Sequence, residues 1–241
     1  MSAFSLANIR QTKEQRLSLP GKAGVMDALL QGAAEPRISG NRLQVAIVLH
    51  PHPLQEGTMH NKVVYTLART FRQFNIPVLR FNFRGVGQSA GVYDHGAGET
   101  DDLISIMQQI QQEHLLVDFW LAGFSFGSFV AYQAYTQSCH TYAIKHLCLV
   151  GPPTERYAYP LLSFPEDLYF VLLQGMQDEI VNPHANVQWF EQLAARQKHH
   201  QHHQRIHMIK CTTGHFFHGK LTQLKQMYGQ SIEQTLNIQQ Q

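Results

Sequence analysis

The chain has 241 residues, 44% of them hydrophobic, which is enough for one sizeable core. Its 19 basic and 17 acidic side chains give a formal net charge of +2, and only 15% of residues are charged, so nothing indicates a nucleic acid or another polyanion as a partner. The three cysteines form no Cys-x-x-Cys pair and the N-terminus has no long apolar segment, which argues against disulfides, secretion and membrane insertion.

We therefore expect a single domain over residues 1–241 in the reducing cytoplasm, with residues 1–14 as a loosely ordered lead-in. Two short strands at 15–19 and 25–30 predict a hairpin at a sheet edge. A continuous apolar run at 45–49 is typical of a parallel strand covered on both faces. From 61 to 74 apolar residues recur every three or four positions, as on one face of a helix.

The rest of the chain alternates between strand and helix patterns. In chain order we expect a strand at 78–83, a helix at 99–112, a strand at 119–124, a helix at 127–137, strands at 146–150 and 169–173, a helix at 186–195, a strand at 206–210 and a last helix from Leu221. This alternation predicts an α/β fold with a mostly parallel sheet flanked by helices on both faces. The segment between the strands at 146–150 and 169–173 is too short for a large cap domain. Ligands of such sheets bind beyond the carboxyl ends of the strands.

A serine motif lies at one of these strand ends. Gly123-Phe124-Ser125-Phe126-Gly127 matches the Gly-x-Ser-x-Gly nucleophile elbow of the α/β-hydrolase fold, and it falls between a predicted strand and a predicted helix, as the motif requires. We predict Ser125 as the nucleophile, with the amide of Phe126 and the positive end of the following helix facing a developing oxyanion. The alternative is a glycine-rich packing turn with an incidental serine.

The acid and the base of such a site follow later strands, in the order nucleophile, acid, base. Asp178 comes directly after the strand at 169–173 and is the predicted acid, with Glu179 as the fallback. The alternative roles of Asp178 are a solvent-facing turn carboxylate and a cap for the helix after Pro183. His215 follows the last strand and is the predicted base. His218 competes with it but lies nearer the final helix.

The loop after the strand at 45–49 reads His50-Pro51-His52-Pro53, at the position that supplies the second oxyanion-hole amide in this fold. Proline has no N–H, so the amide of His52 is the first candidate and that of Leu54 the second. Because the prolines restrict the loop, the donor would be held rigidly, and rigid donors stabilise an oxyanion best.

A metal site is the rival interpretation of the histidines. His50, His52, His215 and His218 could converge at one end of the sheet and bind zinc. No His-Glu-x-x-His spacing is present, and a triad accounts for the serine, the aspartate and the histidine together, so we expect neither a metal nor an organic cofactor. The cluster His199, His200, His202 and His203 precedes the last strand, and we interpret it as a solvated surface segment away from Ser125.

Two further segments lie close to the predicted site. Residues 84–89 follow a strand but lack the Gly-Lys-Ser/Thr ending of a phosphate loop, so we expect a structural turn. An aromatic segment follows the strand at 146–150, and its side chains either line the acyl pocket or pack over the sheet. These side chains are Tyr157, Tyr159, Leu161, Leu162 and Phe164.

Several separated stretches together carry a family resemblance. They are residues 50–54, 57–59, 61–64, 79–89 with Gly91, 121–127, 178–181 and 215–219. On these stretches, from about residue 45 to 224, the chain resembles the small bacterial α/β-superfamily hydrolases related to dienelactone hydrolase. The resemblance implies an esterase-like hydrolase with Ser125, Asp178 and His215 as its triad. The chain departs from the pattern at Glu56, Met176 and residues 197–204, and it has serine where dienelactone hydrolases proper have cysteine, so we do not expect dienelactone as the substrate.

The expected activity is two-step acyl transfer on a small ester: Ser125 attacks, His215 shuttles the proton, and water clears the acyl-enzyme. The partner is then a small-molecule substrate, with no nucleic acid and no membrane. Two alternatives stay open, a histidine-ligated metal hydrolase and a non-catalytic binding protein on the hydrolase fold.

Overall fold

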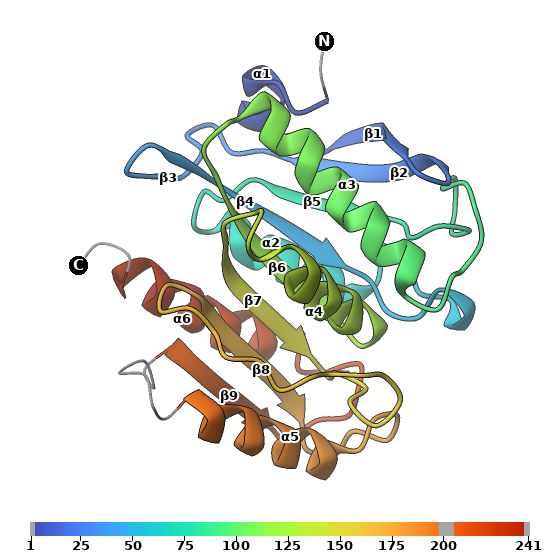
Figure 1. Cartoon of the computed structure of the whole chain (residues 1–241), viewed down its shortest axis with the longest axis vertical. Coiled ribbons are helices and arrows are strands. Elements are labelled where there is room, and N and C mark those ends of the chain that lie inside the picture. The colour runs from blue at the N-terminus through green and yellow to red at the C-terminus, as the bar shows by residue number, and fades with distance from the viewer. Residues whose placement is uncertain (1–2, 198–204, 239–241) are drawn as a thin grey trace.

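The structure is a computed structural model that describes residues 3–197 and 205–238. Within these residues nine strands form one sheet (Figure 1). The order across it is β1 (Gln15–Gly21), β2 (Gly24–Gln31), β5 (Val78–Phe81), β4 (Arg42–Leu49), β6 (Val117–Phe124), β7 (Ile144–Val150), β8 (Tyr169–Gly175) and β9 (Ile206–Cys211), and the short β3 (Ile38–Ser39) pairs with β4. All neighbours from β5 to β9 along this order are parallel, while β1 and β2 pair with each other and with β5 in the antiparallel sense. The predicted hairpin at a sheet edge is confirmed.

Helices cover both faces of the sheet, as predicted. The cores on the two faces assign α3 (Ala97–Glu113), α4 (Phe126–Ser138) and α5 (Pro183–Arg196) to one face, and α2 (Lys62–Arg72) and α6 (Leu221–Ile238) to the other. The central strand β4 shows why its apolar run is continuous. Its odd-numbered residues 45, 47 and 49 join the core with α3 and α4, and its even-numbered residues 46 and 48 join the core with α2 and α6. Successive side chains of a strand point to opposite faces, and here both faces are covered.

The N-terminal segment is more ordered than its sequence indicates. Residues Leu6–Arg10 form α1, whose first turn is capped by the Ser5 hydroxyl accepting from the amide of Asn8. Phe4 and Ile9 are buried in the core that contains α3. The prediction of a loosely ordered lead-in is therefore wrong for this stretch. A five-residue helix is too short to show a helical period, so only its tertiary contacts reveal it.

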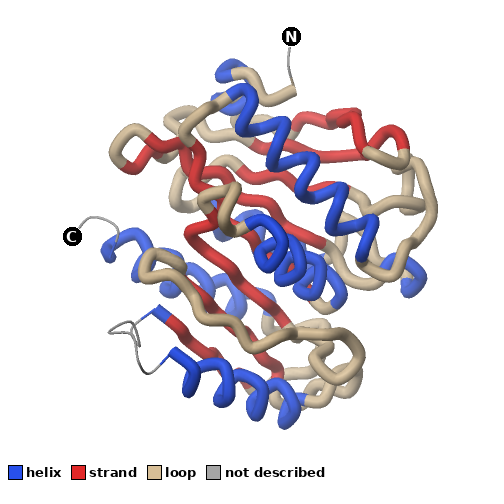
Figure 2. Tube along the Cα trace, in the orientation of Figure 1, coloured by secondary structure: helices blue, strands red, loops and turns tan. Residues whose placement is uncertain are grey.

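Long loops gather beyond the carboxyl ends of the parallel strands (Figure 2). The connection between β7 and β8, residues 151–168, contains no helix or strand, so nothing of the size of a cap domain covers this edge within the described residues. Residues 84–89 form a turn in which the Arg84 guanidinium donates two hydrogen bonds to Asp102 of α3, at 2.9 and 3.0 Å. That turn is structural, as expected. None of the helices in the described part of the chain has the length and apolar character needed to cross a membrane.

Candidate active site

Ser125 sits on a sharp turn between β6 and α4. Its backbone angles are φ 54° and ψ −119°, a conformation that L-residues adopt only under strain of about 1–3 kcal/mol. The turn is held by the Ser125 amide, which donates to the carbonyl of Val150 at the end of β7 (2.8 Å). Ser125 thus lies at the carboxyl end of the sheet, partly exposed, at the N-terminus of a 13-residue helix.

The two glycines of the motif are required by close backbone contacts. A Cβ on Gly123 would lie 2.2 Å from the carbonyl oxygen of Gly127, and a Cβ on Gly127 would lie 2.6 Å from the carbonyl oxygens of His50 and Leu49. Real Cβ atoms do not approach other atoms this closely. The tight turn and the packing of α4 against the end of β4 therefore both depend on glycine.

The structure brings Asp178 and His215 together. Asp178 Oδ2 lies 2.7 Å from His215 Nδ1, and both side chains are almost completely buried, at 1% and 2% exposure. Because a carboxylate is an acceptor, Nδ1 carries the proton, which leaves Nε2 as the nitrogen able to take one. The imidazole ring packs at a tilt against Phe124, the residue before Ser125, with ring centroids 4.8 Å apart, so the pair lies directly beside the elbow.

The carboxylate of Asp178 is fixed by the loop that contains it. Its Oδ1 accepts from the amides of Ile180 and Val181, both at 2.9 Å. On the other side Gln174 Nε2 approaches Oδ2 at 3.4 Å, and Gln174 in turn accepts from the Asn186 side chain at 2.7 Å. Gln174 and Asn186 are buried, so Asp178 is oriented by a connected polar network. The sequence analysis did not find these two residues, because amide side chains at such positions have no recognisable motif.

Gly151 is a third residue that the sequence analysis missed. It has φ +53°, and a Cβ there would lie 3.2 Å from His215 Cε1 and 3.5 Å from Asp178 Oδ2. The end of β7 thus passes against the histidine–aspartate pair, and a side chain here would crowd the pair in a backbone conformation that favours glycine. Its place directly after a strand, one strand away from the elbow, is the signal that could have identified it.

Glu179 and His218, the alternatives to the predicted acid and base, have other partners. The carboxylate of Glu179 accepts from the backbone amide of His215 at 3.3 Å and so supports the loop rather than the imidazole. The His218 side chain is exposed and its ring packs on Phe216 at 5.7 Å. Neither residue takes the place of Asp178 or His215 in the observed geometry.

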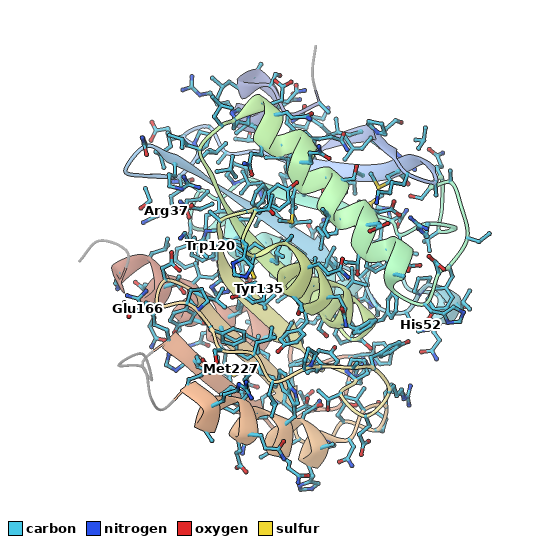
Figure 3. The ribbon with its side chains drawn as sticks, in the orientation of Figure 1. Arg37, His52, Trp120, Tyr135, Glu166 and Met227 are labelled. Atoms are coloured by element: carbon cyan, nitrogen blue, oxygen red, sulfur yellow. The ribbon has the colours of Figure 1, made fainter. Side chains whose placement is uncertain are left out.

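His52 lies in the loop after β4, three residues beyond its last residue Leu49, at the edge of the molecule where the strands point (Figure 3). Its ring packs on Phe126 at 5.1 Å, so the two residues predicted to donate oxyanion-hole amides are neighbours. The amide of Leu54, the second candidate, donates to His52 Nδ1 at 3.2 Å and is therefore engaged. Burial lowers the pKa of His52, with Arg156 and His95 lowering it further and Glu99 opposing them.

His50, which directly follows β4, anchors the same loop through two hydrogen bonds. Its Nδ1 lies 2.7 Å from the carbonyl oxygen of Pro51, and its Nε2 accepts from the amide of Phe83 at 2.9 Å. The Pro51 carbonyl belongs to the same peptide plane as the His52 N–H, so His50 fixes the orientation of that donor. Burial lowers the pKa of His50 to about 3, which keeps the ring neutral and its two nitrogens in these distinct roles.

The four histidines do not form a metal site. Both nitrogens of His50 bond to the backbone, and Nδ1 of His215 bonds to Asp178. Across residues 3–197 and 205–238, no group of three or more His, Cys, Asp or Glu side chains is placed to hold a metal ion. These contacts argue against the rival interpretation, in which the four histidines bind zinc. His199, His200, His202 and His203 lie outside the described residues.

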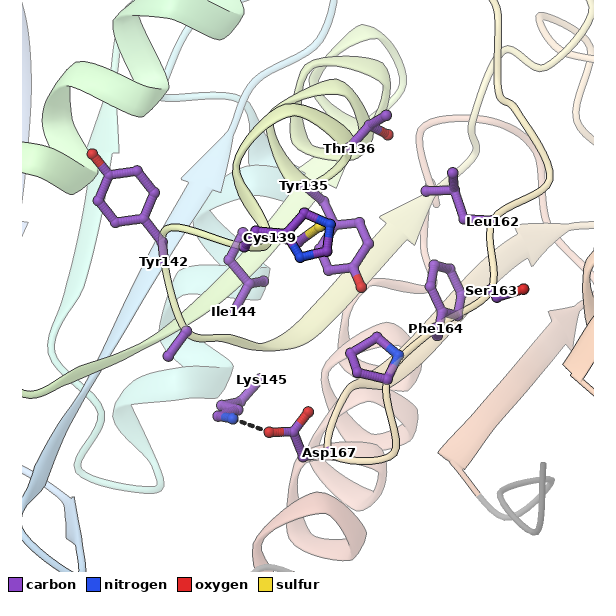
Figure 4. Close-up of a pocket in the computed structure, with 13 residues that line it drawn as sticks. Tyr135, Thr136, Cys139, Tyr142, Ile144, Lys145, Leu162, Ser163, Phe164 and Asp167 are labelled. Carbon is purple, nitrogen blue, oxygen red and sulfur yellow. Dashed lines mark hydrogen bonds and ion pairs between the residues drawn. The ribbon is translucent and has the colours of Figure 1, made fainter.

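A cavity of about 560 Å³ lies away from Ser125, at the end of the sheet where the parallel strands begin (Figure 4). It opens beside Ile144, where β7 begins, and Leu162 and Phe164 line it. Two roles were left open for these residues, lining the acyl pocket or packing over the sheet. The second holds for both of them and for Tyr159, which is buried in the core. Tyr157 alone of that aromatic set packs beside the elbow, 5.6 Å from the ring of Phe126.

A mostly parallel sheet flanked by helices, with a serine on the strand-to-helix turn, defines the α/β-hydrolase fold. Comparison with known proteins agrees. A family model described as serine aminopeptidase, S33, matches residues 56–168. A lidless α/β serine hydrolase from Xanthomonas campestris is 33% identical, with 92% of this chain and 94% of that chain covered and a TM-score of 0.76. An α/β serine hydrolase homologue from Coxiella burnetii is 31% identical over 90% and 96% of the two chains, also with a TM-score of 0.76.

An uncharacterized protein of Rickettsia prowazekii (strain Madrid E) is 39% identical over 142 residues, which span 57% of this chain and 58% of that protein. The chain belongs to the α/β serine hydrolase family.

Proposed function

We propose that this protein is a serine esterase that cleaves small carboxylic esters through an acyl-enzyme, with Ser125 as nucleophile, His215 as base and Asp178 as the acid that orients it. The observation that carries the proposal is the buried hydrogen bond between Asp178 and His215, beside the strained turn that presents Ser125. A nucleophile, a base and a group that orients the base are the three parts that covalent acyl transfer requires.

In the first step Ser125 Oγ forms a bond to the carbonyl carbon while His215 Nε2 takes the hydroxyl proton. The positive charge on the ring is stabilised by the Asp178 carboxylate at Nδ1. The carbonyl oxygen becomes an oxyanion, facing the amides of Phe126 and His52 and the positive end of α4. His215 then gives its proton to the leaving alcohol oxygen as the carbon–oxygen bond breaks.

In the second step water attacks the acyl-enzyme with His215 again as the base, and Ser125 Oγ takes the proton back as the acid product leaves. No residue in this sequence of steps needs a metal or an organic cofactor. The cytoplasmic location and the relation to dienelactone hydrolases stay predictions. Two free cysteines buried in the structure, Cys148 and Cys211, fit a reducing compartment.

The test is hydrolysis of short-chain p-nitrophenyl esters and labelling by a fluorophosphonate probe, with wild type, Ser125→Ala and Ser163→Ala. Ser163 is an exposed serine at the distal cavity and serves as the matched control. We expect Ser125→Ala to lose both labelling and activity, by at least about ten-thousandfold, and Ser163→Ala to retain both.

Three other results would redirect the proposal. Activity that survives Ser125→Ala and disappears with a chelator would support the metal alternative. Faster cleavage of aminoacyl-p-nitroanilides than of esters would make the protein a peptidase with the same triad. An inert wild type that does not label would favour a binding protein on this fold.

A further inference from the structure

A cavity of about 400 Å³ lies between the loop that contains His52 and the loop that contains His215. One wall is formed by Glu56 and Thr58, the other by Phe216 and His218. Phe216 directly follows His215, and its ring packs at 6.0 Å on Phe124, the residue before Ser125. The lining of the cavity is therefore connected to the elbow through the contact between Phe216 and Phe124, on the side of the base.

The other side of Ser125 is occupied by aromatic rings in mutual contact. The ring of Phe126 lies 5.6 Å from those of Tyr93 and Tyr157, and Tyr157 stacks on Phe129 at 4.4 Å. His52 packs against the same group, 4.8 Å from Tyr93. This side therefore offers little depth for an acyl chain.

The chemistry of the proposed reaction indicates which side of Ser125 holds the leaving alcohol and which side holds the acyl group. His215 must hand its proton to the oxygen of the leaving alcohol, so the alcohol lies beside His215, against the loop that contains Phe216. The oxyanion points to the amides of Phe126 and His52, which leaves the aromatic side for the acyl group. The open cavity is thus on the leaving-group side, and the aromatic side, which has little depth, accepts a small acyl group.

The lining of the cavity indicates the kind of alcohol. Lys62 and Glu56 contribute one charge of each sign, and His60, His218 and Thr58 add hydrogen-bonding groups. The Phe216 ring, 37% exposed, supplies a flat apolar surface among them. A balanced set of hydrogen-bonding groups around an exposed ring suits a neutral, polyhydroxylated molecule, whose C–H face packs on the ring while its hydroxyls bond to the rim.

We propose that the cavity is a leaving-group subsite and that the substrates are short-acyl esters, such as acetyl esters, of a sugar or another polyol. This rests on the proposed function, since it presumes that Ser125 forms an acyl-enzyme. The specificity is asymmetric: a small acyl group on the aromatic side and a larger, polar alcohol in the cavity.

The test compares two esters with the same acyl group, 6-O-acetylglucose and ethyl acetate. The variants are Phe216→Ala, His218→Ala and Tyr65→Ala. Tyr65 is an exposed aromatic residue on α2 outside the cavity and is the matched control for Phe216. We expect wild type to favour 6-O-acetylglucose in kcat/KM, and Phe216→Ala and His218→Ala each to reduce that preference about tenfold. Tyr65→Ala keeps it.

A second readout separates this role from a general disturbance of His215. Every acetyl ester gives the same acetyl-enzyme, from which the alcohol has already left, so a leaving-group subsite acts on acylation and not on deacylation. Rapid-quench measurement with p-nitrophenyl acetate gives the two rates. If both variants leave the preference unchanged, or if they slow deacylation as much as acylation, the subsite assignment is wrong. A wild type with neither a burst nor fluorophosphonate labelling would instead overturn the proposed function itself.

Discussion

Two buried histidines, one at the end of the sheet and one inside it, show what separates a functional imidazole from a structural one. His215 bonds through Nδ1 to the Asp178 carboxylate. His146, on β7 and fully buried, has its Nε2 3.1 Å from the Tyr228 hydroxyl and its Nδ1 3.3 Å from the Thr235 hydroxyl, both on α6. Burial lowers the pKa of His146 to about 3.

The two histidines differ in their hydrogen-bond partners and in their position, because His146 lies within β7 and His215 follows the end of β9. Hydroxyl groups satisfy the nitrogens of a neutral ring but offer no charge to balance a proton, so His146 stays neutral under Trp120, on which it stacks at 4.7 Å. A carboxylate stabilises the positive ring that forms when a serine gives up its proton. The same residue type, almost equally buried, is therefore suited to packing in one place and to proton transfer in the other.

The largest effect is expected when the charged partner of His215 is replaced by a neutral one, as the hydroxyl partners of His146 are. Asp178→Asn keeps the size of the side chain but removes the charge and favours the wrong tautomer of the ring. We expect esterase turnover to fall about ten-thousandfold, measured with p-nitrophenyl acetate. Glu179→Gln is the matched control, because its carboxylate reaches only the backbone of His215, and it should keep turnover within about tenfold. Similar losses in both variants would contradict the assignment of the acid.

His50 sharpens the comparison, since it is as buried and as neutral as His146 but anchors the oxyanion loop. His50→Phe retains a ring to pack on Phe83, 4.2 Å away, but loses the bond that holds the Pro51–His52 peptide. We expect turnover to fall about a hundred- to a thousandfold, as for loss of an oxyanion donor. His146→Phe is the same substitution within the core, and its folded fraction should turn over at the wild-type rate. Full activity of folded His50→Phe would show that the loop needs no such anchor.

A smaller effect follows from crowding the histidine–aspartate pair. The added methyl group of Gly151→Ala would lie 3.2 Å from His215 Cε1, in a backbone conformation that disfavours alanine. A displaced imidazole reduces turnover by up to about a hundredfold. Gly40→Ala has the same backbone strain, with φ +60°, but no atom within 4 Å of the new methyl group. If both variants lose the same activity, strain rather than contact with His215 is the cause.

Most of the fold could be predicted from the sequence because its elements are long and strongly patterned. Residues 61–74 were expected as a helix and form α2 (Lys62–Arg72), and the apolar run at 45–49 lies within β4 (Arg42–Leu49). The elements that escaped prediction, α1, β3 and a 3-10 helix at Pro53–Gln55, have five, two and three residues. Such short pieces show no period, and only contacts made after folding stabilise them.

The site could be predicted only where a residue type carries its own chemistry. Ser125, Asp178 and His215 follow strands in the order that the elbow motif implies, and the structure brings Asp178 and His215 together as expected. Gly151, Gln174 and Asn186 support that pair through shape and amide hydrogen bonds, which depend on distances between separate strands. His50 was considered as a metal ligand because the sequence does not show that its nitrogens face backbone groups.

The smallest effect concerns stability, and it tests whether His146 is neutral in the fold. Its pKa falls from 6.5 to about 3 on folding, so between these values the unfolded chain binds a proton that the folded chain does not. The contribution of His146 to the free energy of unfolding is therefore fully present above pH 6.5. It decreases as the pH falls below that value, by about 1.4 kcal/mol per pH unit. His146→Phe lacks this term. Urea unfolding of wild type and variant between pH 7 and pH 4 should show a shallower decline in the variant by that slope, with the other titrating groups common to both. Parallel declines would mean that His146 is protonated in the folded protein, and that hydroxyl partners can support a charged imidazole after all.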